Sequence, residues 1–418
     1  MSKLIVTGEK RLSGEINIHG AKNSVLPILA ATVLCGGKSV IHNCPRLSDV
    51  DASLNILKHL GCRCTFEKNT VTVDTAKFGC SRIPDELMRE MRSSVVFLGA
   101  ILGKCGNAII STPGGCELGP RPIDLHISAL IKLGAEVCEK HGFIEFSTPH
   151  GLKGAEINLS FASVGATENI ILAASTAQGT TVINNAAKEP EICDLADFLN
   201  SCGAEIYGCG SSTVIIHGVK NLEGCTHSVI PDRIAAATYM AGAAATSGKI
   251  TLNNVEPLHL AAVNSVFQEA GCNIDSYGNS ITIAAPEKLN RVSIVRTVVY
   301  PGFPTDAGPL ILAMLAVANG TSIIVENIFE NRFRYVDELK RFGAKVKIEG
   351  RVAVIEGVDR LYAASCKCTD LRGGAALVIA ALCAQGTSVI EDIHHIKRGY
   401  ENIAERFNAL GGNIYEEL

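Results

Sequence analysis

The chain has 418 residues, of which 47% are hydrophobic, and its formal net charge is -4 at pH 7. This length allows about two or three domains with large cores. The near balance of charges excludes a surface built to bind nucleic acid or a membrane. The first residues lack the apolar run of a signal peptide, and apolar stretches such as residues 375–384 are too short to span a bilayer. We therefore expect a soluble, cytoplasmic protein.

The sequence contains 16 cysteines but no CxxC pair. The closest spacings are Cys62-x-Cys64 and Cys366-x-Cys368, and neither is the spacing of a zinc site. A cytosolic cysteine usually behaves as a small hydrophobic residue. We therefore expect most of these thiols to be reduced and in the core, and we expect no zinc site among them.

A pattern of helix, turn and strand recurs six times along the chain. A small-residue apolar segment is followed by a glycine and then by a β-branched stretch, as at residues 179–183. We interpret this as an apolar helix that ends at a glycine cap and is followed by a strand. These glycines are Gly37, Gly106, Gly179, Gly248, Gly320 and Gly386.

Each repeat continues with a variable loop and an amphipathic helix that stops at a second glycine. Residues 194–203 are an example, with Leu195, Phe198 and Leu199 on one helical face. A strand resumes after this glycine. Six matches in register at one period indicate true internal repeats. The second glycines, spaced by 68 to 73 residues, are Gly61, Gly134, Gly203, Gly271, Gly343 and Gly411.

The alternation of strands and helices predicts an α/β fold. The Ala- and Gly-rich helices, such as residues 236–245, are apolar on nearly all sides, so they belong inside with the sheets around them. Six repeats therefore predict two inside-out, barrel-like α/β domains of three repeats each. We place the first domain, which carries the Cys116 loop, at residues 21–229. The second domain takes residues 1–20 and 230–418.

Function is expected where the repeats differ, at the starts of the apolar helices and in the loops after the strands. A helix N-terminus offers free N–H groups and a positive dipole end, so charged residues there favour anion pockets. Any single arginine at such a spot is more often solvated or salt-bridged, and Asp306 is more often a helix cap than a base. The charged residues at helix starts are Lys22, Arg92, Asp232, Arg233, Asp306, Asp370 and Arg372, and those in the loops include Arg121, Arg332, Arg334 and Arg398.

The loop STPGGCELGPRPIDLH, residues 111–126, places Cys116 near Arg121 among glycines and prolines. Such a run cannot be the interior of a helix or strand. A nearby cation favours the thiolate form, so we give this thiol a functional role as readily as a structural one. It lacks an obvious histidine partner, which argues against a papain-like hydrolase. The sequence has no GxGxxG, and GGKS at residues 36–39 lacks the spacing of a P-loop.

Seven motifs in order along the chain carry a resemblance to a known family. They are GAKN, PGGCELGPRPIDLH, SVGATEN, FPTD, FENRF, TDLR and RGYE. From about Lys3 to the last helix the chain resembles the UDP-N-acetylglucosamine enolpyruvyl transferases (1-carboxyvinyltransferases). The resemblance implies two inside-out α/β domains with the active site in the cleft between them.

The resemblance also implies a reaction. The enolpyruvyl group of phosphoenolpyruvate passes to the 3'-hydroxyl of UDP-N-acetylglucosamine by addition and elimination, and phosphate leaves. The resemblance implies no metal ion and no organic cofactor for this reaction. This is the first committed step of peptidoglycan synthesis, and so serves cell-wall growth, cell shape and division. Cys116 on its lid loop would be the general acid, would form an adduct with phosphoenolpyruvate and would be the target of fosfomycin. Asp306 would accept the proton of the sugar hydroxyl.

The resemblance also implies binding residues at the positions where this sequence matches the family's motifs. Those implied for phosphoenolpyruvate are Lys22, Asn23, Arg121, Arg332, Arg372 and Arg398, of which Lys22 and Arg398 also count as catalytic. Those implied for UDP-N-acetylglucosamine are Asn23, Arg92, Arg121, Pro122, Ile123, Asp124, Leu125, Ser163, Val164, Gly165, Asp306 and Ile328.

One position departs from the family pattern, because Phe161 stands where many members have a lysine before the SVG motif. A charge contact to the diphosphate is therefore not expected there. Two other functions stay open. One is a sister transferase with another hydroxyl acceptor, such as shikimate 3-phosphate. The other is a catalytically silent sensor of UDP-sugars, against which the complete set Lys22, Cys116, Asp306 and Arg398 argues.

Overall fold

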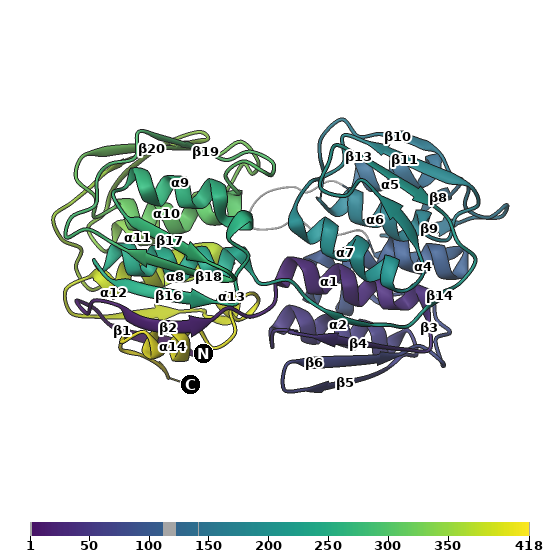
Figure 1. The fold of residues 1–418 in the computed structure, drawn as a ribbon, viewed down its shortest axis with the longest axis horizontal. Coiled ribbons are helices and arrows are strands. Elements are labelled where there is room, and N and C mark those ends of the chain that lie inside the picture. Colours follow the sequence, from purple (N-terminus) through teal and green to yellow (C-terminus); the bar gives the residue numbers. More distant parts are fainter. Residues whose placement is uncertain (1, 112–122, 141, 418) are drawn as a thin grey trace. The chain divides into compact units, whose positions relative to one another are not determined.

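One module of helices and strands is used six times, three times in each of two units (Figure 1). The computed structural model describes residues 2–111, 123–140 and 142–417. Residues 20–111, 123–140 and 142–230 belong to one unit, and residues 2–19 and 231–417 belong to the other. The chain thus passes from one unit to the other after His19 and returns after Ile230, each one residue from the expected boundary.

The unit of residues 20–230 holds three main sheets, with the strand orders β15-β4-β6-β5, β7-β9-β8 and β10-β11-β13-β12, and a short pair β14-β3. Their strands are β3(Cys35–Gly36), β4(Lys38–His42), β5(Arg63–Glu67), β6(Thr70–Asp74), β7(Asn107–Ser111), β8(Glu136–Lys140), β9(Phe143–Ser147), β10(Glu156–Asn158), β11(Thr180–Asn184), β12(Glu205–Tyr207), β13(Thr213–His217), β14(Leu222–Glu223) and β15(Thr226–Ser228).

The other unit also holds three sheets, with the orders β17-β18-β16-β2, β19-β20-β22-β21 and β23-β24-β1-β25. Their strands are β1(Lys3–Thr7), β2(Ser13–Asn17), β16(Lys249–Asn253), β17(Asn273–Tyr277), β18(Ser280–Ala284), β19(Ile294–Arg296), β20(Thr321–Val325), β21(Lys345–Glu349), β22(Val352–Glu356), β23(Ser365–Lys367), β24(Thr387–Glu391) and β25(Ile414–Glu417).

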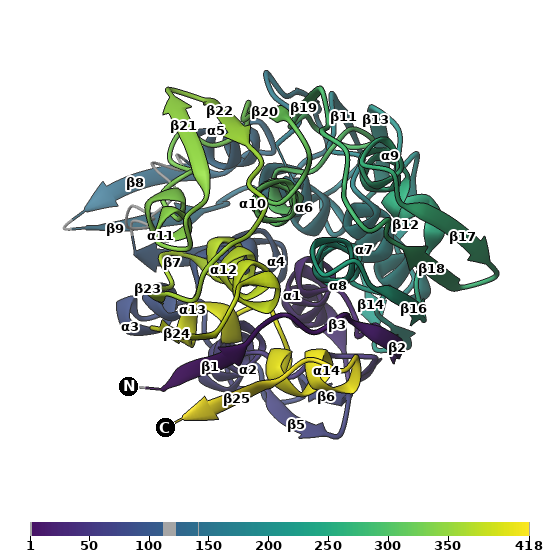
Figure 2. The same cartoon turned by 90° about the vertical axis from the view of Figure 1, so that its left-hand side faces the viewer.

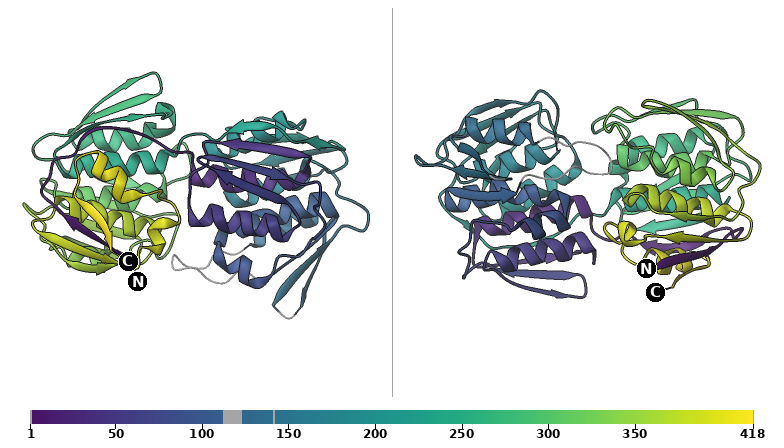
Figure 3. Two further views of the ribbon diagram at one scale, coloured as in Figure 1. Left: turned by 90° about the horizontal axis from the view of Figure 1, so that it is seen from below. Right: turned by 180° about the vertical axis from the view of Figure 1, so that it is seen from behind.

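The four-stranded sheets share one pairing scheme. An edge strand pairs in parallel with the strand that follows the buried helix, as β10 does with β11. That strand also pairs antiparallel with one strand of an antiparallel pair, which is a hairpin in each of these sheets except β23-β24-β1-β25. Between β10 and β11 the buried helix supplies the crossover that a parallel pair needs. The N-terminal segment completes the second unit, because β2 pairs with β16 and β1 lies between β24 and β25. The two chain ends therefore lie side by side (Figure 3).

Six helices are buried inside the sheets, as the sequence predicts. All 13 residues of α8 are buried, and α8, α10 and α12 lie together in the middle of their unit (Figure 2). Small side chains permit this, since a Cβ on Gly242 would lie 2.7 Å from the Phe407 ring. The predicted inside-out α/β fold is confirmed. The buried helices are α1(Lys22–Ala31), α4(Phe97–Cys105), α6(Val164–Ala174), α8(Arg233–Ala245), α10(Gly308–Leu315) and α12(Leu371–Cys383).

An amphipathic helix follows the first strand of each repeat and ends at a left-handed glycine. All six second glycines have φ between 87° and 100°, as a helix terminus of this kind requires. These helices are α2(Ser48–His59), α5(Asp124–Lys132), α7(Pro190–Ser201), α9(Ala261–Glu269), α11(Val336–Lys340) and α14(Ile403–Ala409). The remaining short helices are α3(Asp85–Glu90), α13(His394–Lys397), η1(Thr32–Leu34), η2(Arg92–Val96), η3(Pro257–Leu260) and η4(Thr305–Ala307).

The first set of glycines does not cap helices as predicted. Only Gly106 is a C-cap residue, whereas α6 ends at Ala174, well before Gly179. These glycines lie in the turn that leads into the strand. In the fourth repeat Ser247, not Gly248, has the left-handed backbone, with φ 51°. Gly248 is needed for another reason, because a Cβ there would lie 2.3 Å from the Leu12 carbonyl oxygen.

The cysteines are less uniformly buried than the sequence suggests. The 15 cysteines in the described part of the chain are all free thiols, but only seven of them are buried, while Cys105 and Cys138 are exposed. Within the same residues no helix is long and apolar enough to cross a membrane.

Glu168 in α6 makes stability depend on pH. Burial, with Glu191 and Glu189 nearby, raises the pKa of Glu168 to about 8. Between pH 4.5 and 8 the unfolded chain therefore loses a proton that the folded chain keeps, so this residue lowers stability as pH rises. We expect Glu168→Gln to raise the free energy of unfolding at pH 8 by about 1–3 kcal/mol, with little effect near pH 4.5.

Urea denaturation of both proteins at the two pH values measures this difference. Glu136→Gln, a change at an exposed position, is the matched control and should have no effect at either pH. An equal effect of Glu168→Gln at both pH values would contradict the ionisation argument.

Candidate functional site

The predicted site residues lie at the starts of buried helices and in the loops after the strands. Cys116, Arg121 and Pro122 lie outside the described residues, so their roles stay predictions. Arg92 begins η2, directly before α4. Each unit holds its own group of the remaining residues.

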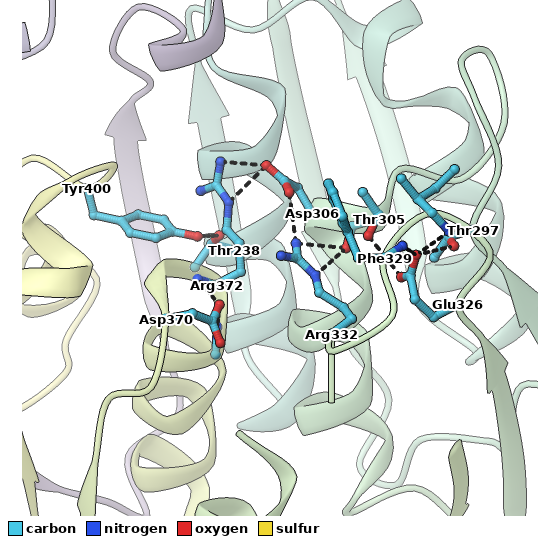
Figure 4. A network of polar contacts seen from close by, with 12 residues as sticks. Thr238, Thr297, Thr305, Asp306, Glu326, Phe329, Arg332, Asp370, Arg372 and Tyr400 are labelled. Atoms are coloured by element: carbon cyan, nitrogen blue, oxygen red, sulfur yellow. Dashed lines mark hydrogen bonds and ion pairs between the residues drawn. The ribbon is translucent and has the colours of Figure 1, made fainter. Parts of the chain in front are cut away.

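Asp306 is the centre of the group in the second unit, at the start of α10. Its Oδ1 lies 2.8 Å from Nη2 of Arg332, and its Oδ2 accepts from Nε and Nη2 of Arg372 at 3.2 and 3.1 Å (Figure 4). The Asp306 side chain is 26% exposed, whereas the two arginine side chains are 2% and 3% exposed. The helix-cap role expected as the more common one therefore does not describe this carboxylate, which is a reachable anion between two buried cations.

The two arginines are themselves fixed by the backbone. Arg332 donates from Nε and Nη2 to the Thr305 carbonyl at 3.2 and 3.0 Å, so it binds both the residue before Asp306 and Asp306 itself. Arg372 lies in the first turn of α12, where Asp370 caps the helix by accepting from the Arg372 and Gly373 N–H groups at 3.0 and 2.9 Å.

Arg372 is bordered by the loop after β24. Its guanidinium lies 5.3 Å from the centre of the Tyr400 ring, and the Tyr400 hydroxyl is 2.8 Å from Thr238 Oγ1 on α8. Burial alone would lower the pKa of Arg372, but the nearby Tyr400 and Asp306 raise it further above its usual value. Arg398 lies two residues before Tyr400 and is half-buried at the end of α13.

Lys22 and Asn23 begin α1 in the first unit. Lys22 is buried, and its Nζ lies 2.7 Å from Oδ2 of Asp49, a buried acid in the first turn of α2. Asn23 beside it is exposed. The sequence analysis missed Asp49, although an acid on the apolar side of an amphipathic helix could have indicated it.

Two further predicted segments, residues 123–125 and 163–165, are linked by a pair of buried side chains. Nδ2 of Asn169 lies 2.9 Å from Nδ1 of His126, and a Cβ on Gly165 would lie 3.1 Å from Cε1 of the same ring. Asn169 also accepts from the Gly99 N–H at 2.6 Å. Burial lowers the pKa of His126 to about 4, so the ring is neutral at pH 7.

His126 and Asn169 therefore hold the starts of α5 and α6 together, a link that sequence reasoning missed. Phe161, three residues before the start of α6, is exposed, with 47% of its surface accessible. Over the parts of the chain described here, no three His, Cys, Asp or Glu side chains are grouped so that they could hold a metal ion.

The fold and these motifs define a class of enzyme. The sequence profile of the EPSP synthase (3-phosphoshikimate 1-carboxyvinyltransferase) family matches residues 6–407, and the chain belongs to this family. Its curated relatives include UDP-N-acetylglucosamine 1-carboxyvinyltransferase 2 of Caldanaerobacter subterraneus subsp. tengcongensis, 50% identical over 99% of both chains. Another is UDP-N-acetylglucosamine 1-carboxyvinyltransferase 1 of Symbiobacterium thermophilum, 48% identical over 99% of this chain and 94% of that one.

Solved structures share the fold over the whole chain. The enolpyruvyl transferase NikO from Streptomyces tendae has a TM-score of 0.89 and 23% identity, covering 100% of this chain and 99% of its own. EPSP synthase from Acinetobacter baumannii has a TM-score of 0.76 and 19% identity, covering 99% of both chains. At these identities the likeness concerns the fold alone.

The Lys22–Asp49 pair gives a test of stability. Removing one partner of a buried ion pair leaves the other charge uncompensated, so Asp49→Ala should lower the free energy of unfolding by about 3–5 kcal/mol. The double variant Lys22→Met, Asp49→Leu removes both charges and should be more stable than Asp49→Ala alone. Urea denaturation at pH 7 measures the free energy of unfolding of both variants. A double variant as unstable as the single variant would contradict the explanation by an uncompensated buried charge.

Proposed function

We propose that this chain transfers the enolpyruvyl group of phosphoenolpyruvate to the 3'-hydroxyl of UDP-N-acetylglucosamine and releases phosphate. In a cell this is the first committed step of peptidoglycan synthesis in the cytoplasm. The curated relatives at 45–50% identity carry the name of this activity. The observation that carries the proposal is the reachable Asp306 carboxylate between the buried Arg332 and Arg372.

The reaction needs an acid, a base and several cations. The sugar oxygen adds to C2 of phosphoenolpyruvate while C3 takes a proton, and a tetrahedral intermediate forms. Loss of phosphate and of a C3 proton then gives the enolpyruvyl ether. Cys116 would protonate C3, and Asp306 would take the proton of the sugar hydroxyl. No step requires a metal ion or an organic cofactor.

Phosphoenolpyruvate is a small, highly charged anion, so several converging cations are needed to bind it and to stabilise the charge that develops. Lys22, Arg121 and Arg398 would hold it, with Arg332 and Arg372 beside them. Because Asp306 carries a single negative charge and pairs with both arginines, an incoming carboxylate or phosphate would share their positive charge. This exchange of anions would free Asp306 to act as a base.

The sugar nucleotide would be bound by both groups of residues. Its ligands in the first unit would be Asn23, Arg92, residues 121–125 and residues 163–165, and Ile328 and Asp306 would contribute from the second unit. The link between His126 and Asn169 supports this, since it brings two of these segments together. Phe161 offers an apolar surface where many family members have a charge, so the diphosphate would be held by other groups.

Phosphate release from phosphoenolpyruvate tests the reaction. Release should require UDP-N-acetylglucosamine, and Cys116→Ser should slow it about 100-fold or more, since a positioned acid contributes that much. No release with this acceptor would reject the proposal, and shikimate 3-phosphate would then test the sister transferase. No release with either acceptor, together with binding of the sugar nucleotide, would favour the silent sensor. Release that survives in Cys116→Ser would assign the proton to another donor.

Inactivation by fosfomycin tests the lid thiol separately. Fosfomycin is an epoxide that a thiolate can open, so the wild-type protein should gain the mass of one fosfomycin molecule and lose activity. Cys116→Asp keeps an acid but has no thiol, and it should stay active and unmodified. The exposed Cys105 and Cys138 serve as controls, because their serine variants should be inactivated like the wild type. An equally sensitive Cys116→Asp enzyme would refute the assignment.

A further inference from the structure

Glu326 is a buried carboxylate that the reaction scheme above does not use. It directly follows β20 and is 1% exposed. Its Oε1 accepts hydrogen bonds from Thr297 Oγ1 at 3.0 Å and from the N–H groups of Ile328 and Phe329 at 2.7 and 3.0 Å. Its Oε2 accepts from Thr305 Oγ1 at 2.8 Å (Figure 4). Four donors therefore converge on one carboxylate.

Comparison of the repeats shows that the turn after the first strand is built differently in the fifth repeat. In the first, third and fourth repeats, an asparagine six places after the turn glycine has a left-handed backbone, and its side-chain Nδ2 donates to a carbonyl just past the edge strand. These bonds are Asn43 to Val229, Asn185 to Leu159 and Asn254 to Ile18, at 2.8, 2.9 and 2.7 Å.

The fifth repeat makes the same bond one residue later. There Nδ2 of Asn327, seven places after Gly320, donates to the Thr297 carbonyl at 3.0 Å. Thr297 follows β19 as Leu159 follows β10, so the two carbonyls are equivalent. The N–H of Glu326 donates to the Arg351 carbonyl at 2.8 Å, a bond that the residue after the asparagine makes in the other three repeats. The shared turn therefore uses the backbone of Glu326 but does not require its carboxylate.

The four donors connect Glu326 to two parts of the proposed site. Thr305 precedes Asp306, and its carbonyl accepts the two bonds from Arg332. Ile328 is one of the residues assigned to the sugar nucleotide. One buried side chain thus fixes both the segment that carries the proposed base and the turn that carries a proposed sugar contact.

We propose that Glu326 is a positioning residue for the acceptor substrate. It holds Thr305 and the turn of Ile328 and Phe329 in one arrangement, so that Asp306 and Ile328 meet the same sugar. Burying a carboxylate among neutral donors is unfavourable unless it accepts several hydrogen bonds, and these four satisfy it. The inference rests on the proposed function for the identity of the acceptor.

Two substitutions separate positioning from simple stability. Glu326→Ala removes all four acceptor contacts. Glu326→Gln keeps a carbonyl oxygen for Thr297, Ile328 and Phe329, and its amide N–H can donate to the Thr305 hydroxyl. We expect the glutamine variant to retain kcat/KM for UDP-N-acetylglucosamine within about 5-fold, and the alanine variant to lose about 100-fold, as a small misplacement can cause.

In the Glu326→Ala variant, the KM values for the two substrates must change by different amounts. In Glu326→Ala, KM for the acceptor should rise and kcat should fall, whereas KM for phosphoenolpyruvate should stay within about 2-fold. Asn254→Ala is the control. It removes the turn contact of the fourth repeat that corresponds to the bond from Asn327 to Thr297, and it does not touch the Asp306 group. It should lower the melting temperature and leave both KM values unchanged.

The following outcomes would overturn the proposal. They are equal rises in both KM values, a Glu326→Ala variant that loses only thermal stability, or a glutamine variant as impaired as the alanine variant. If the wild type releases no phosphate with UDP-N-acetylglucosamine, the proposed function fails and the same ratios are measured with shikimate 3-phosphate. Hydrogen exchange at the Ile328 and Phe329 amides gives a test free of substrate, because it should become faster in Glu326→Ala but not in Glu326→Gln.

Discussion

The burial of each repeat's first helix inside its own sheets constrains everything else in this protein. In α8, which is buried along all 13 residues, the one charged side chain is Arg233, at the N-terminal end. The N-terminal end has free N–H groups and a positive dipole, and acids cap it, as Asp232 does by accepting from Ile234 and Ala235 at 2.8 and 2.9 Å. Charged side chains therefore collect there: Lys22 and Arg372 lie in the first turns of α1 and α12, and Asp306 lies in η4, directly before α10.

The pairing of Asp306 with two arginines follows from the same constraint. Guanidinium groups that are 2–3% exposed are unfavourable without a nearby anion, and Asp306 supplies one to both. The group thus places two guanidinium charges around one carboxylate, which balances them only in part. An anionic substrate can replace part of that balance without leaving a buried charge uncompensated. This gives a physical reason for the close association of a proposed base with anion-binding arginines.

In this fold the features that the repeats share have structural roles, and a feature that differs between them reaches the proposed site. In the turn after the first strand, an asparagine side chain donates a hydrogen bond to a carbonyl just past the edge strand. This bond has a structural role in each repeat in which it is found. In the fifth repeat Glu326 lies directly before this asparagine, and its carboxylate reaches the segment of Asp306 by accepting from Thr305 Oγ1. A turn can gain such a polar contact without disturbing the buried helices, since loops accept sequence changes more readily than packed elements do.

The sequence by itself determined the six-fold repeat, the inside-out α/β fold and the second set of left-handed glycines. These depend on local spacing and on which helices are apolar on all sides, which a sequence displays directly. The helix starts that carry Lys22, Asp306 and Arg372 were also visible as charged exceptions within the repeats. Only the tertiary structure decided their partners. Asp306 meets residues 26 and 66 positions away, and Lys22 meets Asp49 on another helix. Such pairs are set by how the repeats pack, and no periodicity along one chain records that.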